Sequence, residues 1–277
     1  MPELPEVELV CRALAAHCRG SRIASAQLIR RKLAPDITPK AFAEKLKGAT
    51  IQQVSRYGKH IIFEFDKPHT LLAHLRMTGR FLLLSSGQAL PKHTHALFEF
   101  EDTRRLAFMD QRHFGMMKVV DAHKLRQTKE LKSLAPDPFS EDFTLDYLAA
   151  AFARSNSPIK AVLLNQTKVS GLGNIYAAEA LFLAGIHPAT IASTVSRARL
   201  KRLRDSILSV LHESILHGST LNVDPQNLEG SYYGGGFGGM WRVYDRENAP
   251  CSQCARKVKR IIQAGRSTYF CGTCQRS

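Results

Sequence analysis

Four of the six cysteines lie near the C-terminal end of the chain, in the pattern Cys251-x2-Cys254-x16-Cys271-x2-Cys274. Two such pairs at this separation are typical of a zinc ribbon, because each tight turn presents two thiolates to one tetrahedral ion. The same four thiols could instead form two disulfides. Cytosolic thiols stay reduced, and nothing in the sequence indicates export. The spacing therefore favours a closed structural zinc site with no open position for a substrate.

The first three residues could also carry chemistry. Removal of Met1, which the small residue after it permits, would leave Pro2 with a free secondary amine. A backbone amine titrates near ~7.7–8.0 against ~10.4 for lysine, so more of it is uncharged at neutral pH and able to form a Schiff base. Glu3 could donate a proton if burial favours its neutral form. Proline and glutamate are also ordinary residues of a helix start, so these residues alone do not establish catalysis.

A third candidate is the segment Gly171-Leu172-Gly173-Asn174, which precedes a predicted helix. Two glycines there allow backbone N–H groups to approach a phosphate, and Asn174 would lie at the helix start. Because a helix and not a strand comes before it, the segment favours a helix–turn–helix phosphate clamp over a dinucleotide site. A purely structural turn would use the same residues.

Composition narrows the class of protein. The chain of 277 residues has 39 lysine and arginine residues against 24 acidic ones, a formal net charge of +15. Nucleic acid is the commonest polyanion for such a protein, although a generally basic surface would have the same composition. Hydrophobic residues make up 44% of the chain, and no apolar stretch approaches the ~18–20 residues of a membrane span. We expect a soluble intracellular protein that has no membrane partner.

The elements that must position these residues fall into two classes. Helical spacing follows Pro5 and ends at Gly20, with Cys11 and Cys18 interpreted as core thiols. From about residue 22 to 120, short alternating runs such as Phe63-Glu64-Phe65 predict an antiparallel sandwich.

Residues 134–138 contain two prolines and are interpreted as a linker. Beyond the linker the hydrophobic period changes to 3.6 and predicts four helices, beginning near Leu145, Ile159, Ile175 and Ser196. The last of them should run to about His217, and its basic run over residues 197–204 is interpreted as a solvated face.

Taken together, these segments resemble bacterial formamidopyrimidine-DNA glycosylase, within the formamidopyrimidine-DNA glycosylase and endonuclease VIII family. The resemblance rests on residues 1–8 (MPELPEVE), 134–138 (LAPDP), 171–177 (GLGNIYA) and 265–271 (GRSTYFC), which occur in the same order. It therefore spans the whole chain. Leu4 is typical of the members that act on oxidised purines.

The resemblance implies an α+β fold of several domains. A catalytic antiparallel β-sandwich domain flanked by helices, including an N-terminal one, would occupy residues 1–133, and a linker residues 134–144. A helical domain with the helix–two-turns–helix motif would bind DNA with residues 145–240. The zinc-ribbon β-hairpin would occupy residues 241–277.

It also implies roles for four catalytic residues. Pro2 would be the nucleophile that attacks C1′ of the damaged nucleoside, and Glu3 the acid that assists opening of the sugar ring. Lys59 matches a lysine that grips phosphate and is assigned proton donation in β-elimination. Arg266 matches the hairpin arginine assigned to the δ-elimination step.

Further positions match residues that bind DNA. The matched DNA contacts are His93, Arg112, Asn156, Lys160 and Asn174. Three side chains match those that fill the gap left by the extruded base, namely Met77, Arg112 and Phe114. Because a base inside a duplex shields its C1′, an enzyme of this kind must flip the base out and fill the space behind it.

Several positions depart from the family pattern. Ala255 follows Cys254 where glycine is common, which should alter the turn of the zinc knuckle. Gln111 and His113 flank Arg112 where proline, valine or a basic residue is usual. The largest departure lies in residues 229–240, in a loop that covers the flipped base in the family, so this segment bears directly on the choice of lesion.

The resulting prediction is a bifunctional DNA glycosylase and abasic-site lyase of base excision repair, specific for 8-oxoguanine and formamidopyrimidines. It would act on damaged double-stranded DNA through a Schiff base at Pro2 and cleave the strand by β,δ-elimination. The expected cofactor is one structural zinc ion, with no redox cofactor. We expect a monomer in the bacterial cytoplasm, associated with the nucleoid through DNA. The alternatives are an endonuclease VIII-like glycosylase for oxidised pyrimidines and a lesion-binding protein without catalysis.

Overall fold

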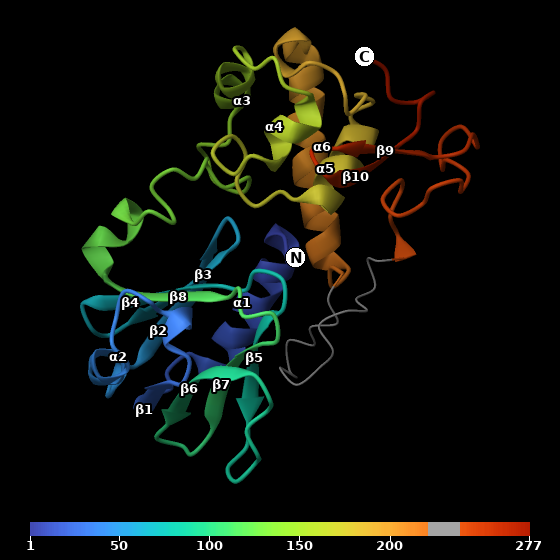
Figure 1. Cartoon of the computed structure of the whole chain (residues 1–277). Helices are drawn as coiled ribbons and strands as arrows, with labels where there is room; N and C mark the ends of the chain where they lie inside the picture. The colour runs from blue at the N-terminus through green and yellow to red at the C-terminus, as the bar shows by residue number, and fades with distance from the viewer. Residues whose placement is uncertain (221–238) are drawn as a thin grey trace. The chain divides into compact units, whose positions relative to one another are not determined.

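The computed structural model describes residues 1–220 and 239–277. Contacts divide these residues into two compact units (Figure 1). The first unit consists of residues 1–132 together with Thr220, and the second of residues 133–219 and 239–277. Within the described ranges, no helix combines the length and the apolar character that a bilayer span requires. The loop of residues 229–240, on which the choice of lesion was expected to depend, lies largely outside the described residues.

The first unit contains two four-stranded antiparallel sheets, as the alternating runs predicted. One sheet has the order β1-β6-β7-β5 and the other β2-β3-β4-β8. The bounds of the first sheet are β1 Ile23–Leu28, β6 Thr94–Phe100, β7 Arg105–Asp110 and β5 Gly79–Leu84. Those of the second are β2 Ile51–Tyr57, β3 His60–Phe65, β4 His69–His74 and β8 Met116–Asp121.

Apolar side chains from both sheets form one core. Phe81 packs edge-on between Phe63, at a centroid distance of 5.5 Å, and Phe108, at 5.1 Å. Because Phe63 comes from one sheet and Phe81 and Phe108 from the other, these rings hold the two layers together. The antiparallel sandwich is therefore confirmed.

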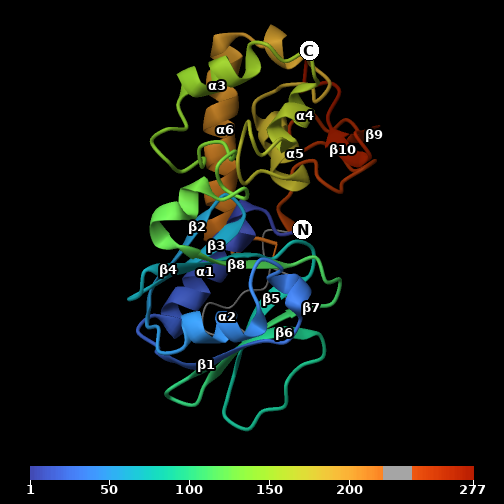
Figure 2. The ribbon, with the colours of Figure 1, turned by 60° about the vertical axis from the view of Figure 1, so that its left-hand side comes forward.

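Two helices flank the sandwich (Figure 2). Helix α1 (Leu4–Cys18) packs against β2 and β3, and its two cysteines are buried, as expected for core thiols. Helix α2 (Pro39–Leu46) packs against β1 and was not predicted, since residues 22–120 were interpreted as strands. Its start was visible in the sequence, because Thr38 caps the helix through the N–H of Ala41 and a proline follows at the first helical position.

The second unit contains four α-helices within the described ranges, close to the predicted positions. They are α3 Leu145–Phe152, α4 Ile159–Leu164, α5 Asn174–Leu183 and α6 Arg197–Leu216. Short 3-10 helices occur at Arg31–Leu33 and Ala122–Gln127 in the first unit and at Ala192–Thr194 in the second. The basic residues at the start of α6 are exposed or half-buried, which agrees with a solvated face.

A two-stranded hairpin of β9 (Lys259–Gln263) and β10 (Arg266–Phe270) completes the second unit. Strand β10 packs against α5, as both views show (Figures 1 and 2). Ala178 and Phe182 from α5 share a small core with Val258 and two of the clustered cysteines. The hairpin is thus an extension of the helical unit and has a common core with it.

Candidate functional site

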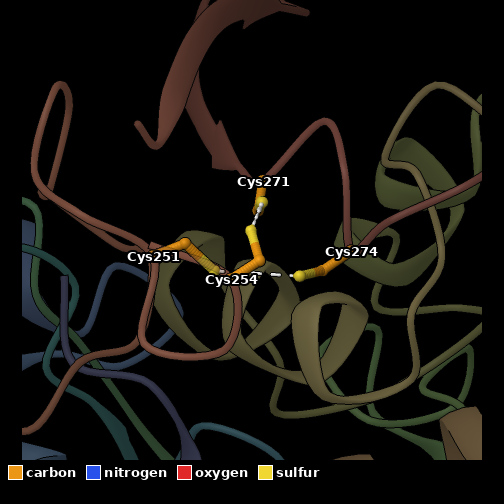
Figure 3. A group of neighbouring side chains, drawn as sticks. All are labelled: Cys251, Cys254, Cys271 and Cys274. Carbon is orange, nitrogen blue, oxygen red and sulfur yellow. Dashed lines mark hydrogen bonds between the residues drawn. The ribbon is translucent and has the colours of Figure 1, made fainter. Parts of the chain in front are cut away.

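The four C-terminal cysteines converge on one point (Figure 3). Their sulfur atoms all lie within 4.8 Å of one another, with Sγ of Cys254 and Cys271 at 3.5 Å and those of Cys251 and Cys274 at 3.8 Å. Ligands at about 2.3 Å from a tetrahedral ion are about 3.8 Å apart, whereas bonded sulfurs are about 2 Å apart. The donor set therefore fits a structural zinc ion, and the alternative of two disulfides is rejected.

Ala255 adopts a left-handed backbone conformation in the zinc knuckle, with φ of 60°. Its N–H donates to the carbonyl of Cys251 at 2.9 Å, so the turn is closed in spite of the side chain. Glycine adopts this conformation without penalty, whereas alanine loses about 1 kcal/mol. The departure from the family glycine thus appears as local strain at Ala255.

The N-terminal residues are held at the start of α1. Pro2 and Glu3 are buried, whereas Met1 is 46% exposed. The N–H of Glu3 donates to the carboxylate of Glu6 at 2.8 Å, and the same carboxylate accepts the hydroxyl of Thr220 at 2.9 Å. While Met1 is present the nitrogen of Pro2 is an amide and has no nucleophilic lone pair, so any chemistry there requires that the exposed Met1 be removed.

Lys59 lies in the tight turn that joins β2 to β3. Gly58 in this turn has a φ of 57°, as a two-residue hairpin loop requires. The buried guanidinium of Arg56 donates to the carbonyl of Gly58 at 3.1 Å and to the carboxylate of Glu8 at 3.0 Å. Because Glu8 lies on α1, this chain of contacts links the turn carrying Lys59 to the helix that begins just after Pro2 and Glu3.

The three predicted gap-filling residues come from two loops of the first unit. Met77 lies between β4 and β5, and Arg112 and Phe114 lie between β7 and β8. Phe114 is 58% exposed, and the guanidinium of Arg112 lies 5.2 Å from the centroid of its ring. An exposed aromatic ring beside an exposed cation suits contact with nucleobases.

His93, a predicted DNA contact, is exposed and has a φ of 64°. Its ring lies 5.8 Å from that of His113, which stacks on buried His95 at 4.9 Å. Nδ1 of His113 and Nε2 of His95 are 3.0 Å apart, so one ring donates to the other. Burial, with the charge of His113 next, lowers the pKa of His95. His113 thereby joins the loop of Arg112 to the strand that follows His93.

In the second unit the turn before α5 is held by Gln166. Its amide donates to the carbonyls of Leu164 at 3.0 Å and Leu172 at 2.8 Å and accepts the N–H of Gly171 at 3.0 Å. Gly171 has a φ of 81°, which explains the glycine. The glycines are apparent in the sequence, whereas Gln166, whose contacts stabilise the turn, was not predicted.

Asn174 is the first residue of α5, as predicted, and its amide donates to the carbonyl of Ser267 at 3.0 Å. Its Oδ1 is buried without a hydrogen-bond partner among the described residues. Lys160 on α4 is 1% exposed, and its ammonium donates to the same carbonyl at 3.0 Å and to the hydroxyl of Thr268 at 2.7 Å. Two residues that were predicted as DNA contacts thus hold strand β10, and the ammonium of Lys160 is buried against it.

Arg266 is exposed at the start of β10. It follows the turn Ala264-Gly265, in which both residues have positive φ, the geometry of a two-residue hairpin loop. Residues 251–277 contain six lysine or arginine residues and no acid. Asn156, a further predicted DNA contact, is exposed after α3.

A further buried residue of the second unit, Glu179, was not predicted from the sequence. Glu179 is fully buried on α5, and its carboxylate accepts the backbone N–H groups of Arg242, Val243 and Tyr244 at 2.8–2.9 Å. Three such bonds fix the segment that leads into the zinc knuckles. A lone glutamate within an apolar helix was the only sequence signal.

Comparison with known proteins covers the whole chain. Three family models match: the formamidopyrimidine-DNA glycosylase N-terminal domain over residues 1–117, the H2TH domain of this enzyme over 134–224, and the zinc finger found in FPG and IleRS over 249–276. Formamidopyrimidine-DNA glycosylase of Roseobacter denitrificans is 40% identical over 289 residues, with both chains covered completely. That of Trichormus variabilis is 39% identical, with 99% of this chain and 100% of the relative covered.

Solved structures agree with the sequence comparisons. The FPG protein of Lactococcus lactis in complex with DNA containing an oxidised pyrimidine has a TM-score of 0.90 and 33% identity, with both chains covered completely. A mutant of the same protein with DNA containing Fapy-dG has a TM-score of 0.91 at 33% identity and the same coverage. Agreement in sequence and fold over the full length makes this chain a DNA glycosylase of base excision repair. It belongs to the formamidopyrimidine-DNA glycosylase family, which confirms the resemblance predicted from the four segments.

Proposed function

We propose that this chain excises 8-oxoguanine and formamidopyrimidines from double-stranded DNA and then cleaves the strand at the abasic site by β,δ-elimination. The observation that carries the proposal is the retention of Pro2, Glu3 and Lys59 in a chain that matches the family along its full length. Leu4, typical of the members that act on oxidised purines, supports the choice of lesion.

The chemistry begins once Met1 is removed and the nitrogen of Pro2 becomes a secondary amine. This nitrogen forms a bond to C1′ while the bond from C1′ to the damaged base breaks, and the proton that the amine loses neutralises the departing base. Glu3 supplies the proton that the ring oxygen takes up when the sugar opens, which leaves an iminium between Pro2 and C1′. No redox cofactor takes part, since every step is a proton transfer, a substitution or an elimination.

Strand cleavage follows from the acidity that the iminium gives to the neighbouring carbon. C2′ loses a proton to solvent, its electron pair forms a double bond between C2′ and C3′, and the bond from C3′ to its phosphate breaks, with Lys59 as the proton donor of this β-elimination. A second elimination breaks the bond from C5′ to its phosphate, and Arg266 on the zinc hairpin supports this step. Both cations also stabilise the phosphates that leave.

DNA contacts are proposed at both units. His93, Arg112, Asn156 and Asn174 would position the phosphates, and Met77, Arg112 and Phe114 would fill the space behind the flipped base. Lys160, the fifth predicted DNA contact, is buried and would act on the phosphates through the hairpin that it holds. The enzyme would act as a monomer on the bacterial chromosome, and hence in the cytoplasm at the nucleoid.

Borohydride trapping tests the nucleophile. Reduction of a reaction on an 8-oxoguanine duplex should give a covalent protein–DNA adduct with the wild type and with the matched control Pro5→Ala, which leaves position 2 intact. Pro2→Glu should give no adduct, because the large side chain retains Met1 and no amine forms at position 2. An adduct of equal yield in Pro2→Glu would refute the assignment.

A second candidate is activity on oxidised pyrimidines. It is favoured by the Lactococcus lactis structure, whose DNA contains an oxidised pyrimidine. Paired cleavage assays on 8-oxoguanine and thymine glycol duplexes distinguish the two, and higher kcat/KM on thymine glycol would replace the proposed lesion class. A third, catalytically inactive lesion binder would show no turnover on either duplex.

A further inference from the structure

Asp110 lies at the end of β7, is fully buried, and connects the loops that carry the gap-filling residues. One carboxylate oxygen accepts the hydroxyl of Thr78, which follows Met77 in the loop between β4 and β5. Its other oxygen accepts the N–H of Gly115 at 2.6 Å, in the loop between β7 and β8. A single side chain thus binds to both loops.

Thr78 completes a closed network with the backbone of Arg112. The N–H of Arg112 lies 3.0 Å from the hydroxyl oxygen of Thr78 and 3.2 Å from Oδ1 of Asp110. Because the hydroxyl donates its one proton to the carboxylate, its lone pairs are left to accept this N–H. Every group that faces the side chain of Asp110 in this network is a donor. Both of its oxygens must therefore accept, which an ionised carboxylate does.

The backbone of Asp110 also binds the segment of His93, another predicted DNA contact. Its N–H donates to the carbonyl of His93 at 3.0 Å. The family resemblance assigns four residues of the first unit to DNA contact or to the gap behind the flipped base. These residues, Met77, His93, Arg112 and Phe114, all lie on segments that Asp110 joins.

Two glycines at the core-facing ends of these loops pack closely against Phe108. A Cβ at Gly79 would lie 2.9 Å from the ring of Phe108, and one at Gly115 would lie 2.8 Å from the same ring. Burial by itself would raise the pKa of Asp110, but the hydrogen bonds from Thr78, Gly115 and Arg112 outweigh it and the pKa is lowered. The carboxylate is therefore charged at neutral pH despite its burial.

We propose that Asp110 is a positioning residue that holds the loops around Met77 and Phe114 in one arrangement, so that the three gap-filling side chains enter the duplex as a preformed wedge. This inference rests on the proposed function. Phe114 is largely exposed and so gains little packing from the protein itself. Without the anchor, the ordering of two loops would be added to the cost of base flipping at every encounter with DNA.

The wedge is needed only where a flipped base leaves a gap in a duplex. An abasic site in a single strand has no opposing base and no stack to repair, yet it offers the same C1′ to Pro2. Variants that loosen the wedge should therefore lose activity on the duplex and keep Schiff-base formation on the single strand. This difference separates positioning of the loops from a general loss of structure.

The test compares Asp110→Asn with wild type on both substrates. Asparagine replaces one acceptor oxygen by an N–H donor, which faces another donor in this network. We expect kcat/KM on an 8-oxoguanine duplex to fall about 100-fold, the scale of a small misplacement of binding groups, and borohydride trapping on the single-stranded abasic oligonucleotide to change less than about 3-fold. In Thr78→Val we expect kcat/KM on the duplex to fall about 10-fold, whereas Thr78→Ser should keep the wild-type value.

Asp121→Asn is the matched control, since Asp121 also ends a strand but pairs with Lys124 at the surface. It should match wild type on both substrates. If Asp110→Asn cuts duplex activity and single-strand trapping equally, or changes neither, the inference is wrong. Should Asp110→Asn not fold, the contrast between Thr78→Val and Thr78→Ser decides. Failure of wild-type protein to be trapped on an 8-oxoguanine duplex would instead contradict the proposed function.

Discussion

Two regions of this molecule present, from short turns, exposed side chains that we propose to contact DNA. One region is held by a buried cation and the other by a buried anion. In the second unit the ammonium of Lys160 binds the carbonyl of Ser267 beside Arg266. In the first, the carboxylate of Asp110 binds N–H groups of the loop that presents Arg112 and Phe114. The hairpin has a zinc site in addition, whereas the loops of the first unit depend on hydrogen bonds within the described residues.

The sign of each buried charge follows from the backbone groups that need a partner. Strand β10 turns a carbonyl toward α4 and α5, and only a donor can satisfy it. The turn after β7 directs N–H groups inward, and only an acceptor can satisfy those. A buried charge is costly unless all of its hydrogen bonds are made, so both residues should be sensitive to conservative substitution.

Removal of zinc should have the largest effect and should separate the two regions. Thiolate–zinc binding supplies roughly 10–16 kcal/mol in small zinc domains, so its loss should unfold the hairpin while the sandwich stays folded. We expect DNA affinity to fall about 100-fold in fluorescence anisotropy, through loss of the basic contacts of the hairpin. Unchanged affinity in protein whose zinc content is zero by mass spectrometry would show that the hairpin is dispensable.

Acid should weaken the first unit through two buried histidines. Burial, followed by the charge of Arg76, lowers the pKa of His60 to about 4, and burial also lowers that of His74, whose ring lies 4.7 Å away. In the unfolded chain a histidine has a pKa near ~6.5. The contribution of the neutral histidines to the free energy of unfolding is therefore fully present above that pH and is lost as the pH falls toward about 4.

For His60 alone the loss amounts to about 3 kcal/mol of unfolding free energy. Urea unfolding between pH 7 and 4 measures it. His60→Phe should flatten the profile, and His123→Gln, a surface control, should not. An equally steep profile in His60→Phe would rule out His60 as the cause.

Lys160→Met tests the clamp of the second unit, by which we mean the contacts of Lys160 with Ser267 and Thr268, and it leaves the metal ligands unchanged. The substitution leaves the hydroxyl of Thr268 without its buried donor and the carbonyl of Ser267 with the amide of Asn174 alone, at a cost of about 2–3 kcal/mol. We expect faster release of zinc to a chelator and a higher ratio of β- to β,δ-elimination product, because Arg266 is displaced. Lys201→Met, at an exposed i,i+4 pair with Asp205, is the control. A wild-type product ratio in Lys160→Met would show that the clamp does not position Arg266.

Ala255→Gly should give the smallest change in stability, and it should raise the stability where the other changes lower it. Relief of the left-handed conformation should stabilise the zinc hairpin by about 1 kcal/mol. Ala153→Gly should instead be destabilising, because Ala153 has helical backbone angles with φ of −55°. Thermal unfolding of the two variants tests both signs.

The features that the sequence predicted depend on local pattern. The zinc site followed from the spacing of four cysteines within one short segment, and the sandwich and the four helices followed from the periodicity of apolar residues. Helix α2 was missed because its eight residues stand between strands, although Thr38 and Pro39 mark its start.

The two anchors could not be predicted, since their partners are distant in the chain. Lys160 is separated from Ser267 by 107 residues, and Asp110 from Thr78 by 32. Nothing in the local sequence distinguishes a buried lysine or aspartate from one at the surface. The same holds for Arg56 and Glu8, which link the turn of Lys59 to α1.

Peptide mapping of the borohydride-reduced adduct tests the central claim most directly. Wild-type protein reduced on an 8-oxoguanine duplex should yield an N-terminal peptide that begins at Pro2, lacks Met1 and carries the mass of the sugar remnant. A remnant found on a lysine such as Lys59, or on a peptide that still contains Met1, would contradict the account.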